Sequence, residues 1–229
     1  MALAAIVVAL AAAGCGGDDS AGPSSTTTTT TLGSSDSAMP EVTDIGTFAV
    51  GKRNEELVDE SRPTDAWGGQ EKLPGRTLPT LVLYPAKGDP ADEAIAPDAS
   101  PVDGRWPVVV FSHGRGGTGP AYTSTLRLWA SAGYVVMAPT YPLTSSDTPD
   151  KPNTADLVNQ PADVSFLADW VTSLPDTNPL AATVDRERLG LAGHSLGAFT
   201  SLAAAYNPAF RDDRVDAVAE WAGAYVGRL

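Results

Sequence analysis

The chain has 229 residues, of which 42% are hydrophobic and 19% are charged, and this suits a single globular domain of ordinary size. Its formal net charge is −13 and its pI is near 4.4. Such a surface repels phosphate backbones and anionic lipid, which argues against nucleic-acid binding. The single cysteine, Cys15, excludes an intrachain disulfide.

The first fifteen residues are predicted to be an export signal that ends in a lipidation site. Residues 1–13 are all apolar, too short a run for a transmembrane helix but typical of a signal-peptide core. The small residues before Cys15 resemble a bacterial lipobox, so we expect a lipid-anchored protein at the outer side of the cell membrane. Ala12 stands where leucine is usual and no basic residue precedes Lys52. An ordinary secretory segment, or a true start further upstream, is therefore the alternative.

A polar linker is expected over residues 16–40. It contains six consecutive threonines, from Thr26 to Thr31, and almost no apolar side chain. Such a composition cannot offset the entropy of ordering, so we expect a flexible tether between the lipid anchor and a folded domain over residues 41–229.

Buried strands alternate with helices along that domain. Strands are predicted over 42–50, 77–84, 108–111, 134–138, 189–192 and 215–221, and helices over 121–132, 162–174 and 196–206. Gly133 is expected to end the first helix, and Pro161 to lie in the first turn of the second. This alternation predicts an α/β fold, a doubly wound and mostly parallel sheet with an antiparallel start.

The pentapeptide Gly193-His194-Ser195-Leu196-Gly197 lies between a predicted strand and a predicted helix. This is the context of a G-x-S-x-G nucleophile elbow, in which a strained turn raises the serine hydroxyl above the sheet. Gly193 and Gly197 would allow strand and helix to approach closely. We therefore predict that Ser195 is a catalytic nucleophile.

A glycine-rich loop follows the strand at 108–111. Residues 113–117 read His-Gly-Arg-Gly-Gly, at the place where such enzymes form the other half of an oxyanion hole. Acyl transfer needs two N–H donors aimed at the developing oxyanion. We predict that the backbone N–H groups of Arg115 and Leu196 form this pair. The Arg115 side chain either lines the acyl site or is solvated.

With the elbow, the stretches 76–86, 106–114 and 132–139 resemble the platelet-activating-factor acetylhydrolase and dienelactone-hydrolase-like group of the α/β-hydrolase superfamily. Bacterial chlorophyllase-like and polyester hydrolases are relatives of this group. The resemblance covers residues 42–226. It implies hydrolysis of a small-molecule carboxylic ester through an acyl-enzyme, with no metal or organic cofactor. Dienelactone hydrolases use a cysteine nucleophile, so Ser195 argues against that activity.

A base and an acid must complete a serine triad. The chain has two histidines: His113 is expected to scaffold the oxyanion loop, and His194 should point away from the Ser195 hydroxyl. Only 34 residues (229 − 195) follow the nucleophile, so we expect the C-terminal part of the fold, with the catalytic histidine, to be absent. The acid is either Glu220 or a residue beyond Leu229.

Three functions remain open from the sequence. The first is a lipid-anchored esterase or lipase-like hydrolase, whose present chain should be nearly inactive and poorly stable because its sheet ends in an exposed apolar strand near 215–221. The second is a binding lipoprotein of the same fold that has lost its triad. The third is a peptidase on the same scaffold.

Overall fold

The computed structural model describes residues 46–92 and 94–223. The expected signal segment with Cys15, the tether at 16–40 and the beginning of the strand predicted at 42–50 lie outside the described residues. No helix in the described ranges is long and apolar enough to cross a bilayer.

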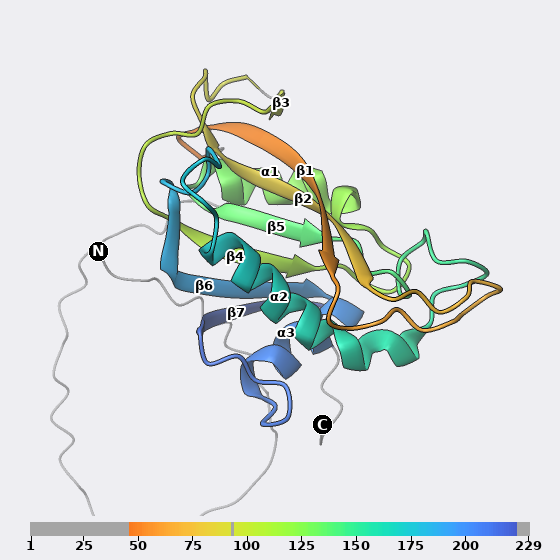
Figure 1. The fold of residues 1–229 in the computed structure, drawn as a ribbon. Coiled ribbons are helices and arrows are strands. Elements are labelled where there is room, and N and C mark those ends of the chain that lie inside the picture. Colours follow the sequence, from red (N-terminus) through yellow and green to blue (C-terminus); the bar gives the residue numbers. More distant parts are fainter. Residues whose placement is uncertain (1–45, 93, 224–229) are drawn as a thin grey trace, which may run out of the picture. The chain divides into compact units, whose positions relative to one another are not determined.

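Seven strands form one mixed sheet (Figure 1). They are β1 (Ala49–Asp59), β2 (Arg76–Ala86), β3 (Ala96–Pro97), β4 (Trp106–Ser112), β5 (Val135–Pro139), β6 (Val184–His194) and β7 (Val215–Trp221), in the spatial order β3-β1-β2-β5-β4-β6-β7. Strands β5, β4, β6 and β7 are parallel to one another, while β2 runs antiparallel to both β1 and β5. The predicted parallel sheet with an antiparallel start is therefore confirmed.

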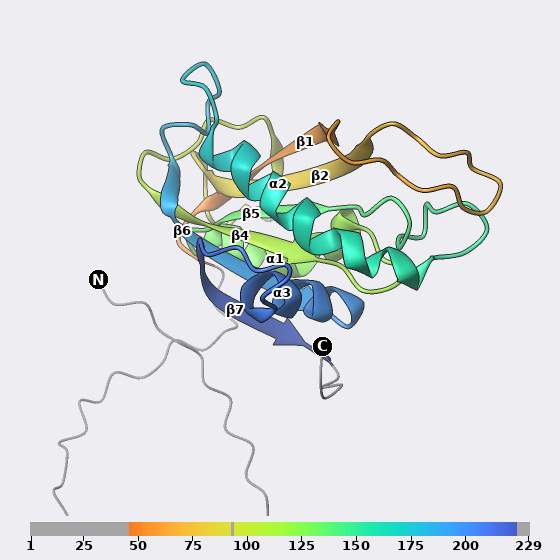
Figure 2. The same ribbon diagram turned by 60° about the horizontal axis from the view of Figure 1, so that its bottom comes forward.

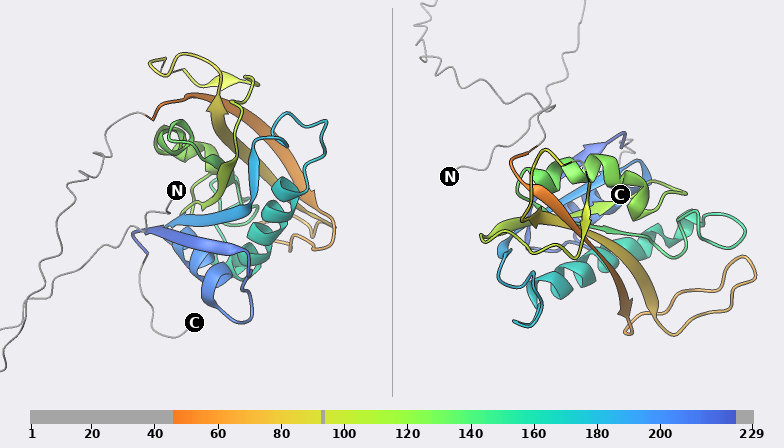
Figure 3. Two further views of the ribbon diagram at one scale, coloured as in Figure 1. Left: turned by 90° about the vertical axis from the view of Figure 1, so that its left-hand side faces the viewer. Right: turned by 90° about the horizontal axis from the view of Figure 1, so that it is seen from above.

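Helices cover both faces of the sheet. Helix α1 (Thr123–Ser131) follows the short 3-10 helix η1 (Gly119–Tyr122), α2 (Gln160–Thr172) follows η2 (Thr154–Asn159), and α3 (Leu196–Tyr206) follows β6. Helix α1 packs on one face, whereas α2 and α3 lie together on the other (Figure 3). One core joins α2 and α3 to the sheet through Val164, Leu167 and Ala204, and the second joins α1 through Leu126 and Ala130. This is the doubly wound arrangement that the sequence pattern indicates.

Several boundaries differ from those expected. Within the described residues the first strand begins at Ala49, not before, and continues to Asp59, with six polar or charged residues among its eleven. Strand β6 starts at Val184, five residues earlier than predicted, because its polar beginning pairs with Trp106 and Pro107 across a register shift. Strand β7 and helix α3 have the predicted bounds.

The parallel strands end at the same edge of the sheet, where two long loops meet. The loop between β1 and β2 reaches out beside the loop that follows β5 (Figure 1). Trp67 Nε1 donates to Lys151 O at 2.7 Å and so joins the two loops. The elbow and the glycine-rich loop lie at this edge too, since they follow β6 and β4 directly. Functional groups of open α/β sheets collect at the carboxyl ends of the strands.

Candidate active site at the carboxyl edge of the sheet

Ser195 forms the turn between β6 and α3. Its backbone has φ 51° and ψ −111°, a combination that residues with a side chain rarely adopt. Its N–H donates to Trp221 O at 2.9 Å at the end of β7, and its carbonyl accepts from Ala198 N–H at 3.1 Å. These bonds hold the strained turn, which costs about 1–3 kcal/mol in other proteins. Within the described residues, the Ser195 hydroxyl has no hydrogen-bond partner.

The two elbow glycines leave no room for a side chain. A Cβ on Gly193 would lie 2.2 Å from Gly197 O, and a Cβ on Gly197 would lie 2.0 Å from Ser112 O and 2.7 Å from His113 O. Each of these separations is far below van der Waals contact, and each neighbouring atom is backbone. The elbow is therefore packed directly on the end of β4, where the glycine-rich loop begins.

The peptide between Gly114 and Arg115 is held in one orientation by two donors to its carbonyl oxygen. Gly117 N–H donates to Gly114 O at 2.9 Å, and Nδ1 of the buried His113 ring lies 2.8 Å from the same oxygen. Tyr141 N–H donates to His113 Nε2 at 3.0 Å, so Nδ1 carries the ring hydrogen and donates. The N–H and C=O of a trans peptide point in opposite directions. The Arg115 N–H is consequently turned away from both of these donors.

The loop and the elbow touch at Gly114 and His194, close in sequence to the two predicted oxyanion donors. A Cβ on Gly114 would lie 2.8 Å from His194 Nδ1 and 3.3 Å from His194 O. Arg115 is the residue after Gly114. Leu196 is the first residue of α3, and the N–H groups in the first turn of a helix have no partner within the helix. The Arg115 side chain is exposed and donates to Pro152 O at 3.2 Å.

A network that sequence reasoning missed ties the same loop to α2 and α3. Gly116 N–H donates to Thr144 O at 2.7 Å, and the Thr144 hydroxyl accepts from the side chain of the fully buried Gln160 at 2.7 Å. The Gln160 side-chain carbonyl accepts in turn from the Thr200 hydroxyl on α3. No motif indicates this network, because its members come from four separate segments.

Among the described residues, neither histidine is hydrogen-bonded to the Ser195 hydroxyl. Both nitrogens of His113 are occupied, and burial lowers its pKa against the opposing effects of the Gly114 acceptor and Asp147. His194 uses Nδ1 for the Tyr122 hydroxyl at 2.8 Å. The structure thus gives His113 the scaffolding place expected from the sequence and engages His194 elsewhere.

Glu220 lies in β7 opposite Gly193 of β6, one strand away from the elbow. The residue is largely exposed, yet partial burial of its carboxyl group raises its pKa. Its role as a triad acid stays a prediction.

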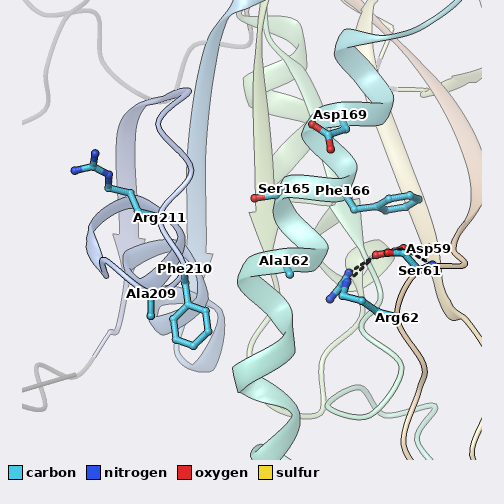
Figure 4. A pocket seen from close by; sticks show the side chains of 10 residues that line it. All are labelled: Asp59, Ser61, Arg62, Ala162, Ser165, Phe166, Asp169, Ala209, Phe210 and Arg211. Carbon is cyan, nitrogen blue, oxygen red and sulfur yellow. Dashed lines mark hydrogen bonds and ion pairs between the residues drawn. The ribbon is translucent and has the colours of Figure 1, made fainter.

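Two hollows in the described surface lie away from these residues. The larger, of about 420 Å³, runs across α2 between the end of β1 and the loop after α3 (Figure 4). Its lining comprises Asp59, Ser61, Arg62, Ala162, Ser165, Phe166, Asp169, Ala209, Phe210 and Arg211. The smaller, of about 220 Å³, lies over β1 and β2. Across the described ranges, no three His, Cys, Asp or Glu side chains converge as metal ligands.

A second buried cluster lies beside the site and was also missed. Arg76, at the start of β2, is fully buried and forms ion pairs with Asp163 of α2 at 2.6 Å and Asp156 of η2 at 3.0 Å. Although burial alone would lower the pKa of Arg76, the hydrogen bonds to the two aspartates raise it. Burial raises the pKa of Asp163 despite its arginine partners. The cluster fastens α2 to the antiparallel part of the sheet.

The fold is similar to that of a solved esterase, over part of that enzyme's length. A ferulic acid esterase from Streptomyces cinnamoneus superposes with a TM-score of 0.59 at 23% identity, covering 74% of this chain and 57% of the esterase. The chain thus spans little more than half of that structure. An alpha/beta hydrolase from Penicillium sp. sh18 has a TM-score of 0.49 at 18% identity, covering 73% of this chain and 45% of its own. No curated protein matches the chain.

The expected resemblance to the α/β-hydrolase superfamily is confirmed by a family model, together with the fold that the ferulic acid esterase shares. The model of the family described as Chlorophyllase matches residues 91–217, which is more than half of the chain and includes both the glycine-rich loop and the elbow. The protein therefore belongs to the chlorophyllase family of the α/β-hydrolase superfamily.

Proposed function

We propose that this chain carries the nucleophile and the oxyanion hole of a serine hydrolase that cleaves carboxylic esters. The observation that carries the proposal is the strained backbone of Ser195 between β6 and α3, packed against a loop whose Arg115 peptide is locked. Strain at one residue is retained where the surrounding structure imposes it, and such residues cluster at active sites. Membership of the chlorophyllase family supports an esterase, as does the fold of the ferulic acid esterase.

In the proposed reaction, Ser195 Oγ attacks the ester carbonyl carbon and loses its proton to a base. The carbonyl oxygen becomes negatively charged and accepts hydrogen bonds from the backbone N–H groups of Arg115 and Leu196. Collapse of this intermediate breaks the bond to the alcohol oxygen, which takes up the proton and leaves. Water then attacks the acyl-enzyme by the same route and releases the acid. The described residues supply the nucleophile and the two donors but not the base.

A second candidate is a binding protein that holds an ester in the same place without cleaving it. Both histidines of the chain are engaged in hydrogen bonds that shape the loop and the elbow. The two candidates differ in one property of the complete gene product: Ser195 is a reactive nucleophile in the esterase and is unreactive in the binding protein.

The deciding experiment is fluorophosphonate labelling, together with hydrolysis of a p-nitrophenyl ester, on the complete gene product. We expect labelling of the wild type and loss of label in Ser195→Ala, with the rate reduced by at least about 10³-fold. Ser124→Ala is the matched control, because Ser124 is exposed on α1. If the wild type neither reacts with the fluorophosphonate nor hydrolyses the ester, the binding protein is the remaining candidate. If Ser195→Ala still reacts with the fluorophosphonate, Ser195 is excluded as the nucleophile.

A further inference from the structure

We propose that Tyr122 is a positioning residue that joins the oxyanion loop to the nucleophile elbow through its hydroxyl group. The inference rests on the proposed function of Ser195. It concerns a side chain that no motif marks and that itself would not touch the substrate.

Tyr122 is the last residue of η1 and lies between the two segments. Its hydroxyl oxygen is 2.8 Å from His194 Nδ1 and 3.3 Å from Gly114 N. The ring packs against Phe111 with centroids 4.7 Å apart, and against the His194 ring with centroids 5.7 Å apart. The ring is therefore held by packing, and its hydroxyl by two polar partners.

One donor role is fixed, because an amide nitrogen can only donate: Gly114 N–H donates to the Tyr122 phenol oxygen. The phenol hydrogen is then available for His194 Nδ1, and when it donates there the histidine ring hydrogen lies on Nε2. The 2.8 Å bond to His194 is the shorter and better of the two.

These bonds act one residue away from each reacting group. Gly114 precedes Arg115, and His194 precedes Ser195, which in turn precedes Leu196. The peptide group between Gly114 and Arg115 is fixed by His113 and Gly117, which both donate to Gly114 O. The Tyr122 hydroxyl fixes the preceding peptide group, because it accepts from Gly114 N–H. The hydroxyl thus sets how the loop lies against the elbow, and with it the spacing of the two oxyanion donors. Hydrogen bonds to an oxyanion weaken steeply when donors move by fractions of an ångström.

Tyr122→Phe is the test variant, since it removes the hydroxyl and keeps the packed ring. Tyr134→Phe is the matched control, because Tyr134 is 41% exposed and its hydroxyl bonds to none of the described residues. The functional measurement, made on the complete gene product, compares an oxygen ester with its thionoester, in which sulfur replaces the carbonyl oxygen. Sulfur accepts hydrogen bonds poorly, so the thionoester draws little help from the oxyanion hole.

For Tyr122→Phe we expect kcat on the oxygen ester to fall about 10-fold, with KM within about twofold and kcat on the thionoester reduced by less than about threefold. Tyr134→Phe should match the wild type on both substrates. An equal fall on both esters would mean general structural damage, and no fall would mean that the hydroxyl is dispensable. Either result overturns the proposal.

A second measurement needs no turnover and is also made on the complete gene product. In protein labelled with ¹⁵N-histidine, His194 should show a protonated Nε2 and an accepting Nδ1, and Tyr122→Phe should shift both nitrogen signals. Unchanged signals would overturn the coupling. If the wild type fails to label or turn over, the proposed function fails instead, and the histidine signals still decide whether Tyr122 couples the loop to the elbow.

Discussion

His113 illustrates how one buried side chain can hold a catalytic peptide in place. Only 1% of its surface is exposed, and each ring nitrogen has a single role, Nδ1 as donor to Gly114 O and Nε2 as acceptor from Tyr141 N–H. Protonation would place a second hydrogen on Nε2, facing the Tyr141 N–H. The loop conformation thus requires a neutral His113 ring. In agreement with this, burial lowers the pKa of His113.

This arrangement predicts a pH dependence of stability. The unfolded chain binds a proton on His113 near the ordinary histidine pKa of about 6.5, whereas the folded chain binds it only at lower pH. The unfolded state therefore gains protons first as pH falls below about 6.5, and the free energy of unfolding decreases by up to about 1.4 kcal/mol per pH unit from this group. Above that range the contribution is fully present.

Urea unfolding of wild type and His113→Asn between pH 5 and 8 measures the effect. Asparagine retains an amide donor near Gly114 O but does not titrate. The variant should be less stable at pH 7, and its stability should fall less steeply between pH 6.5 and 5. The two curves should run parallel above pH 7.5. Equal slopes throughout would show that His113 is not neutral in the folded state.

Among the elements, those with a strong local signal could be predicted and those defined by pairing could not. The apolar run at 108–111 and the glycine-bracketed elbow indicated β4, α3 and the position of Ser195. The beginning of β6, with Asp185, Arg186 and Glu187, is polar and becomes a strand only through its pairing with β4. A polar segment that becomes a strand only by pairing with a neighbour shows no alternation of apolar residues from which the strand could be predicted.

The polar groups beside the candidate site were missed for the same reason. Ser195 lies in a motif that can be read locally, whereas Arg76, Asp156 and Asp163 meet only when β2, η2 and α2 pack together. Gln160 and Tyr122 likewise acquire their partners from distant segments. Burial of Arg76 could not be foreseen, since arginine is almost never fully buried unless it is paired.

The packing of α2 on the sheet should depend on that buried arginine. In Arg76→Met, Asp156 and Asp163 stay buried without their main cation, and we expect a loss of about 3–5 kcal/mol in the free energy of unfolding, measured with urea. Adding Asp156→Asn and Asp163→Asn should recover part of the loss, because the uncompensated charges are then gone.

Arg211→Met is the control for this measurement. Its ion pair with Asp213 is exposed on both sides, so the expected cost is below about 1 kcal/mol. A comparable loss in both variants would mean that the buried pairs contribute no more than a surface pair does.

On the scale of the entire domain, the sheet ends differently on its two sides. One edge is the two-residue strand β3 (Figure 1), and the other is the seven-residue strand β7, which lies at the lower margin of the sheet in Figure 2. The expected exposed strand edge near 215–221 is found at β7, where Asp216, Ala217, Ala219 and Glu220 are exposed and Val215, Val218 and Trp221 are half-buried. Trp221 packs on Trp129 and Phe111, with ring centroids 5.2 and 5.5 Å apart. The outer backbone edge of β7 pairs with none of the described strands.

An open strand edge favours pairing between copies of the chain, even against a net charge of −13. We expect the 229-residue chain to self-associate at micromolar concentration, and Ala217→Lys with Ala219→Lys to reduce the associated fraction in sedimentation velocity. Like charges that flank the edge oppose strand pairing directly. The control pair, Ala155→Lys with Ala162→Lys, changes the net charge equally at exposed positions away from β7. Both pairs lower the overall repulsion between copies, so a decrease confined to the β7 pair would assign association to this edge, and equal behaviour of the two pairs would rule it out.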